Sequence, residues 1–320
     1  MVKFIIRRLL GMIPVLFVIS VLLFTLVQSV PGDAFTGDLN PKIDKKYIDE
    51  MREKFGLNKS PVEQYFIWLK NFAQGEFGIS FKNKLPVSDL IVDRIGNTVF
   101  LAVTTLIITY LLAIPIGIYS ANRPYTLSDN TITTFSFIGL SLPTFFGALL
   151  AIYIFSINLE WFPSSGTVTA GAGYTGIQYL LDRLHHVLLP AVTLAILSVA
   201  SYTRYIRSSV LDVKQQDYVR TAYAKGLPRK KVMRKHVLRN ALMPLITFFG
   251  LDLGGLFAGA VLTETVFTWP GLGRLIFEST VNRDYPVMMT CYMLIAISIL
   301  IGNLIADILY AKADPRVRYD

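Results

Sequence analysis

Two acidic residues within otherwise apolar stretches are the first candidates for chemistry in this sequence. Asp252 lies in the run GLDLGGLFAG, and Glu264 follows it toward the end of the same stretch. A charge at the centre of a bilayer costs at least about 2.5–3.5 kcal/mol on insertion scales, so a carboxylate there usually pairs with a neighbouring helix or faces an aqueous path. We take both residues as candidates for lining such a path, where Asp252 would bind a cationic group. The alternatives are a hydrogen bond from a neighbouring helix to Asp252, and solvation of Glu264 at the membrane edge.

Catalytic and metal chemistry is not predicted. The three histidines are two neighbours at the edge of an apolar stretch, His185 and His186, and His236 in a basic segment, so we expect structural roles for them. The sequence contains neither a GxxxxGK[ST] phosphate loop nor a Ser/His/Asp order typical of a hydrolase. Cys291 is the only cysteine, which excludes an intrachain disulfide. We therefore predict no catalytic residue, no metal site and no cofactor on this chain.

A further feature is the basic segment 217–244, DYVRTAYAKGLPRKKVMRKHVLRNALMP. Its helix-forming residues are interrupted by Gly226 and Pro228, which suit the C-terminal cap of one helix and the first turn of the next. We expect two short helices at an angle that form a docking surface for a partner. The alternative is an amphipathic helix held on anionic lipid by its Lys and Arg side chains.

These residues must be positioned by membrane helices. The 320 residues are 53% hydrophobic and 17% charged, and a mean hydropathy of +0.50 is too high for an ordinary soluble domain. Apolar stretches long enough, or nearly so, to cross a hydrocarbon core of about 30 Å occur at 9–30, 98–120, 132–157, 187–205, 245–267 and 287–311. We expect Pro14, Pro115, Pro143 and Pro190 to kink these spans. Arg204 ends the fourth and weakest of them.

The Lys and Arg residues set the expected orientation. Lys3, Arg7 and Arg8 precede the first span, and a basic tail follows the last, so the positive-inside rule places both termini and the loop 212–244 in the cytoplasm. The net charge of +9 is thereby explained without nucleic-acid binding. The first span is longer than a signal-peptide core, and we expect it to be retained.

The expected organisation has four parts. A transmembrane helix covers 1–30, an outer insertion covers 31–95, a core of five helices covers 96–311 and includes the loop 212–244, and a tail covers 312–320. Within the insertion, 47–55 has a helical pattern and 62–72 an amphipathic one. The insertion is either a cap that lies on the membrane or a rim that contacts an extracellular partner.

Short motifs along nearly the whole chain resemble those of one transporter family. They are IIRRLL at 5–10, VPGD at 30–33, FGL at 55–57, SLPTFF at 141–146, DYVRTAYAKGL at 217–227, RNALMP at 239–244, WPGLGRL at 269–275, NRDYPV at 282–287 and DPR at 314–316. In this order they resemble the B-type permease subunit of oligopeptide, dipeptide and nickel ABC importers. Of the family's general coupling-loop pattern, only Ala222, Gly226 and Leu238 are matched, a departure that is common in peptide-type members.

The resemblance implies a type I ABC importer transmembrane domain: an all-α polytopic membrane protein with six transmembrane helices and a small helical insertion after the first. It implies half of a translocation path for peptides in a prokaryotic cell membrane, the other half being a second homologous permease subunit. Two ABC ATPase subunits would carry ATP and Mg, and an extracellular solute-binding protein would deliver the cargo. The residues implied to couple to the ATPase are Asp217, Arg220, Thr221, Ala222, Ala224, Lys225, Gly226, Leu227 and Pro228.

Other functions stay open at this point. A self-sufficient ion-coupled secondary transporter would use Asp252, although no internal repeat with paired interrupted helices is evident. A membrane-anchored scaffold or receptor would act through the insertion. Among importers, permeases of this kind also carry nickel chelates and oligosaccharides, and the resemblance favours peptides.

Overall fold

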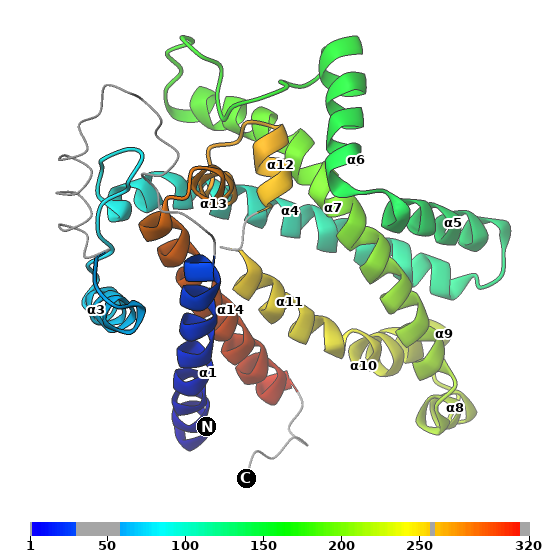
Figure 1. The fold of residues 1–320 in the computed structure, drawn as a ribbon. Coiled ribbons are helices and arrows are strands. Elements are labelled where there is room, and N and C mark those ends of the chain that lie inside the picture. Colours follow the sequence, from blue (N-terminus) through cyan, green and yellow to red (C-terminus); the bar gives the residue numbers. More distant parts are fainter. Residues whose placement is uncertain (1, 30–57, 257–259, 314–320) are drawn as a thin grey trace.

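The computed structural model describes residues 2–29, 58–256 and 260–313, and over these ranges it is built from helices without a β-strand. In chain order they are α1 (Val2–Ser29), α3 (Pro61–Ala73), α4 (Val87–Asn122), α5 (Leu127–Ser141), α6 (Thr144–Ala151), the π-helix η1 (Ile152–Asn158), α7 (Gly176–Lys214), α8 (Asp217–Ala224), α9 (Arg229–Val232), the π-helix η2 (Met233–Leu238), α10 (Arg239–Ala241), α11 (Met243–Gly255), α12 (Val261–Val266), α13 (Leu272–Val281) and α14 (Tyr285–Ala313). Helices α8 to α10 lie at one end of the bundle, α12 and the loop before α7 at the other (Figure 1). The start of α1 and the end of α14 lie toward the same end as α8 (Figure 1).

Four of the predicted spans are single helices long and apolar enough to cross a membrane: α1, α4, α7 and α14. Helix α4 has 36 residues and α7 has 39. At a rise of 1.5 Å per residue they are roughly 54 and 58 Å long, so both extend well beyond a hydrocarbon core of about 30 Å. Arg204 ends the apolar stretch of the fourth span but not its helix, because α7 continues to Lys214.

The stretches predicted as spans at 132–157 and 245–267 are not single straight helices. The first is broken at Pro143, where α5 and the α6–η1 helix meet at 104°. Leu142 is extended, with ψ of 123°, because a residue before proline is disfavoured in the helical region. The second is divided into α11 and the short α12, while α11 meets the helical run 229–241 at 41°. The count reaches six only if each bent pair crosses as one span.

Helices α11 and α14 touch through small residues. A Cβ atom added to Gly302 of α14 would lie 2.2 Å from Cα of Gly254, and one added to Gly250 would lie 2.4 Å from Cα of Ala306. Ser298 Oγ donates a 2.7 Å hydrogen bond to the carbonyl of Gly254. The small residues around Asp252 therefore serve close helix packing, as the sequence led us to expect.

The amphipathic segment predicted at 62–72 is confirmed as a helix, α3, which Ser60 and Glu63 begin with a capping box. Tyr65 is buried against α1, and its hydroxyl lies 2.8 Å from Ser20 Oγ. Phe66, on the same helix, is exposed. The helix predicted at 47–55 and the motifs VPGD, FGL and DPR lie outside the described residues.

The glycine contact between α11 and α14 gives a stability prediction. Gly302→Val must push the two helices apart, and overpacking of this kind costs typically about 1–3 kcal/mol. We expect a lower apparent melting temperature of the detergent-solubilised protein. Gly255→Ala is the matched control, since a Cβ atom there meets nothing within 4 Å. Equal melting temperatures for the two variants would contradict the close contact.

Candidate functional site

A cavity of about 380 Å³ opens between α4, α7, α11 and α12. This volume falls within the range of roughly 300–1,000 Å³ that is usual for small-molecule sites. Its lining is mainly leucine and alanine with four hydroxyl side chains and two carboxylates. The lining residues are Thr98, Leu101, Ala102, Thr105, Leu106, Thr144, Leu194, Leu197, Ser198, Leu251, Asp252, Gly255, Leu256, Ala260 and Glu264. The structure thus brings both acidic candidates of the sequence to one cavity.

Asp252 on α11 is held by tyrosines from two other helices. Tyr110 of α4 donates a 2.6 Å hydrogen bond to Oδ2, and the hydroxyl of Tyr202 on α7 lies 2.8 Å from Oδ1 and 2.9 Å from Oδ2. The Tyr202 ring is stacked on Phe248, with centroids 5.4 Å apart, and this contact holds the ring and its hydroxyl in place. Asp252 therefore accepts hydrogen bonds from two neighbouring helices and also lines the cavity, while its binding of a cationic group stays a prediction.

Glu264 on α12 is fully buried, so its expected solvation at a membrane edge is wrong. Its Oε2 accepts a 2.9 Å hydrogen bond from the backbone N–H of Arg274, and its Oε1 accepts one of 3.0 Å from Thr98 Oγ1. By accepting from Arg274, Glu264 caps the first turn of α13, where free N–H groups and the helix dipole favour a carboxylate. Glu264 thereby joins α12, α13 and α4.

The motif WPGLGRL surrounds this carboxylate. A Cβ atom on Gly271 would lie 2.4 Å from Glu264 Oε2, so only glycine leaves room for the carboxylate there. Trp269 is fully buried and donates a 3.0 Å hydrogen bond to the carbonyl of Asn97, whose Nδ2 donates to the carbonyl of Pro270. Arg183 of α7 donates to Asn97 Oδ1 at 2.9 Å. The motif is therefore a packed junction beside the cavity.

The basic segment forms an elbow, which we define as residues 217–232: α8, a turn at Gly226 and α9. Gly226 has φ of +75°, a left-handed conformation that favours glycine. Its N–H donates to the carbonyl of Tyr223, and the N–H of Leu227 donates to that of Ala222. These two bonds form a Schellman motif that ends α8. The two angled helices expected here are present, with Pro228 at the cap of α9 rather than inside its first turn.

One face of the elbow is buried and the other is exposed. Val219 and Ala222 pack into a core that includes Ile206 and Val210 of α7 and Val237 of η2. Leu227 is half-buried against the same core. The other predicted coupling residues are exposed: Asp217, Arg220, Thr221, Ala224, Lys225, Gly226 and Pro228. Ala222 therefore belongs to the core that stabilises the elbow and not to its exposed face.

Helix α7 is tied to its neighbours at this end. Arg207 donates two hydrogen bonds of 2.7 Å to the carboxylate of Asp129 at the start of α5, which is almost fully buried. Lys214 Nζ donates one of 2.6 Å to the carbonyl of Ala121 near the end of α4. The elbow, α4, α5 and α7 thus form one connected unit.

Comparison with known proteins now identifies the family. Residues 113–319 match the model of the "binding-protein-dependent transport system inner membrane component", and residues 1–102 match that of its N-terminal region. The chain belongs to this family. It is 46% identical over 320 residues to the oligopeptide transport system permease protein AppB of Bacillus subtilis (strain 168), covering all of both chains. It is 36% identical over 319 residues to the glutathione transport system permease protein GsiC of Escherichia coli (strain K12), again over 100% of each.

This membership confirms the resemblance drawn from the motifs and the expected all-α membrane fold. The chain is a multi-pass component of a binding-protein-dependent transport system, and its family is one of membrane permeases rather than enzymes. His185 Nε2 lies 2.8 Å from the carbonyl of Trp161, and His186 Nδ1 lies 2.8 Å from that of Asp182. These contacts fit the structural roles expected for the two histidines.

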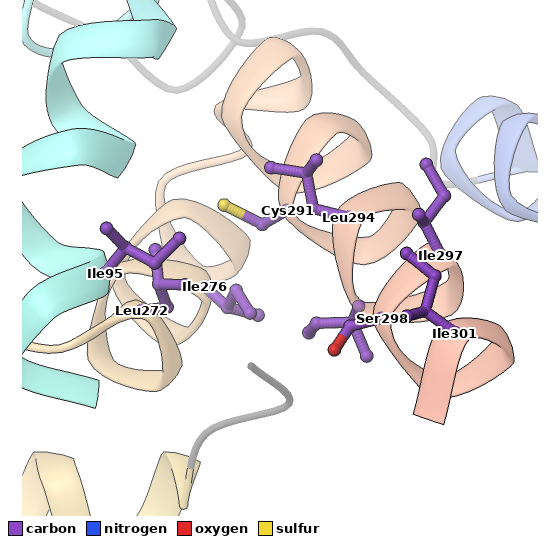
Figure 2. A pocket seen from close by; sticks show the side chains of 9 residues that line it. Ile95, Leu272, Ile276, Cys291, Leu294, Ile297, Ser298 and Ile301 are labelled. Carbon is purple, nitrogen blue, oxygen red and sulfur yellow. The ribbon is translucent and has the colours of Figure 1, made fainter. Parts of the chain in front are cut away.

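A second cavity of this transport component differs in character. Its volume is about 200 Å³. Figure 2 shows Ile95, Leu272 and Ile276 on one side of it and residues of α14 on the other. It is lined by apolar side chains together with the buried Cys291 and with Ser298, whose hydroxyl is already bonded within the protein. A ligand site requires polar groups to orient its occupant, and this cavity offers none. Of these two cavities, the first is therefore the candidate for a path, because it is lined by polar as well as apolar side chains.

Sequence reasoning missed the residues that hold the two carboxylates: Tyr110, Tyr202 and Thr98. Each lies within a stretch read only as an apolar span. Tyrosine in an apolar helix does carry a signal, since a buried hydroxyl needs a partner. What the sequence did not indicate was that both tyrosines meet at Asp252.

The role of Glu264 gives a second prediction. Glu264→Leu leaves the N–H of Arg274 and the hydroxyl of Thr98 without their acceptor, and each buried unsatisfied group costs about 1–3 kcal/mol. We expect a clear fall in apparent melting temperature. The control is Glu278→Leu on α13, which removes only a partly exposed ion pair with Arg274, worth at most about 1 kcal/mol. A larger loss from the control would argue against the capping role.

Proposed function

We propose that this chain is the transmembrane permease subunit of an ATP-driven ABC importer and forms half of the translocation path for peptides. The observation that carries the proposal is the elbow. One face of the elbow is exposed in the part of the chain that the structure describes, and a partner could bind there. The other face is packed on α7, the helix that also lines the cavity. The full-length similarity to an oligopeptide permease supports oligopeptides or dipeptides as cargo.

Helix α7 supplies a route from the elbow to the path. Val210 contacts the elbow's core, and Tyr202 contacts Asp252. The two positions lie about 12 Å apart along one unbroken helix. A helix that keeps its shape transmits rigid-body movement, so closure of ATPase subunits bound to the elbow would move the wall of the cavity. ATP need only favour one arrangement of the subunits to shift the population between inward-facing and outward-facing states.

The partners follow from this arrangement. Two ATPase subunits bind beneath the pair of permease subunits, with the elbow as this chain's contact, and they carry ATP and Mg, since this sequence has no phosphate loop of its own. A second, homologous permease subunit completes the path, and a solute-binding protein delivers the peptide at the opposite end. Both termini and the elbow face the cytoplasm, in line with the clustered Lys and Arg residues, and the insertion 31–95 faces outward.

Reconstitution in liposomes tests this function. We expect uptake of peptide against a gradient only when the partner permease, the ATPase subunits, the solute-binding protein and ATP are all present. The competing function is a self-sufficient secondary transporter. Uptake driven by a proton or sodium gradient through the purified chain alone would refute the importer.

The geometry of the elbow gives a further prediction. Proline cannot adopt φ of +75° and lacks the N–H that Gly226 donates to Tyr223, so Gly226→Pro must disrupt the end of α8. We expect the ATPase subunits no longer to co-purify and ATP-dependent uptake to fall at least about tenfold, as when a central interface contact is lost.

Gly171→Pro is the matched control for that variant. Gly171 also has φ of +75°, but it lies in the loop before α7, at the other end of the bundle. A comparable backbone strain away from the elbow should leave the ATPase subunits bound. Normal assembly and uptake in Gly226→Pro would overturn the coupling role of the elbow.

A further inference from the structure

The cavity between α4, α7, α11 and α12 is lined by a carboxylate, that of Asp252, which has no cationic partner among the described residues. None of its lining residues is Lys, Arg or His, and within the described ranges no basic side chain forms an ion pair with Asp252. Its contacts are the hydroxyls of Tyr110 and Tyr202, which are neutral. The formal charge of Asp252 is therefore positioned but not neutralised by the protein.

The hydrogen bonds leave Asp252 with unused capacity. A carboxylate offers about four acceptor sites, and the two tyrosine hydroxyls supply one proton each. The tyrosines come from α4 and α7 and are not among the residues that line the cavity, whereas Asp252 is. The carboxylate is thus held by side chains that do not line the cavity, while Asp252 itself borders it.

Glu264 does not offer the same opportunity, although it borders the same cavity. It is fully buried, and its oxygens accept hydrogen bonds from a backbone N–H of α13 and from Thr98. Asp129, another buried carboxylate, is neutralised by Arg207. Of these three acids, only Asp252 combines an accessible position in a cavity with an uncompensated charge.

We propose that Asp252 is a cation subsite of the path that receives an ammonium group of the cargo, namely the α-ammonium group of a peptide with a free N-terminus. The inference rests on the proposed function and adds a specificity determinant to it. An ammonium group has three donors and a full positive charge, which match the free acceptor sites and the charge of the carboxylate. The apolar remainder of the lining accommodates side chains without demanding particular ones, so the subsite recognises what peptides share.

The test compares two peptides of one sequence that contains neither Lys nor Arg, one with a free N-terminus and one N-acetylated. ATP-dependent uptake is measured with the complete importer in liposomes, at concentrations of each peptide that saturate the solute-binding protein. Asp252→Asn removes the charge and keeps the shape and an acceptor for the tyrosines. Asp307→Asn is the control, because Asp307 is paired with Arg8 at 3.0 Å and does not line the cavity.

Asp252→Asn is expected to slow uptake of the free peptide at least about tenfold, the effect of losing a hydrogen bond to a charged group, and to change uptake of the acetylated peptide less than about twofold. Asp307→Asn should leave the ratio between the peptides unchanged. Equal losses for both peptides would assign Asp252 a structural role and overturn the inference, as would no loss for either.

A measurement on the unaltered importer keeps the inference testable even where Asp252→Asn fails to assemble. The subsite requires faster uptake of the free peptide than of the acetylated one once the binding protein is saturated, and equal rates would overturn it. Equal, ATP-dependent rates would leave the proposed function standing. Absence of ATP-dependent uptake for both peptides would instead remove the proposed function, and the subsite with it.

Discussion

The hydrogen bonds to Asp252 join the two halves of the helical bundle. One half consists of α4 and α7 with the elbow packed on their end, and the other consists of α11 and α14 in contact through glycines. Tyr110 and Tyr202 belong to the first half, and Asp252 belongs to the second. Because these bonds lie beside the cavity, the arrangement of the two halves and the shape of the cavity are set together.

Burial explains why each of these acids has its own set of donors. A carboxylate removed from water must be solvated by hydrogen-bond donors of the protein. Asp129 has a guanidinium group, Glu264 has a helix N-terminus with a threonine, and Asp284 accepts from Ser80 and from the backbone N–H of Phe81 at 3.0 Å. The last of these fixes the end of the insertion to the turn between α13 and α14. All four acids therefore hold parts of the protein together, and Asp252 in addition borders the cavity while only partly buried.

The sequence predicted those features that depend on local chemistry. Hydropathy identified α1, α4, α7 and α14, because a long apolar run has few alternatives to a helix. The Gly226 and Pro228 pair predicted the elbow, since a left-handed cap and a helix start are properties of those residue types. The break at Pro143 was expected only as a kink, because the residue before a proline can also stay helical in a kinked helix and only packing decides between the two.

Features that depend on distant contacts were beyond the sequence. Glu264 looked like an acid near a membrane edge, but its burial depends on Gly271 and on the first turn of α13, which the chain brings next to it only after folding. Likewise, nothing local marks Tyr110 as a partner of Asp252, since 142 residues separate them. Period and composition specify which face of a helix is apolar, and they do not specify which helix covers it.

The geometry also constrains how the elbow and the path can influence each other. Helix α7 cannot slide or rotate relative to α11 without changing the distance from Tyr202 to both oxygens of Asp252, now 2.8 and 2.9 Å. Helix α11 cannot follow α7 freely, because its backbone is in direct contact with α14 at Gly254 and Gly302. A movement of α7 relative to α11 would therefore change the hydrogen bonds at the carboxylate. A group bound there would in turn favour the arrangement that best satisfies it, because binding and conformational change are linked reciprocally. Under the proposed function, the same few bonds would therefore couple the cavity and the elbow in both directions.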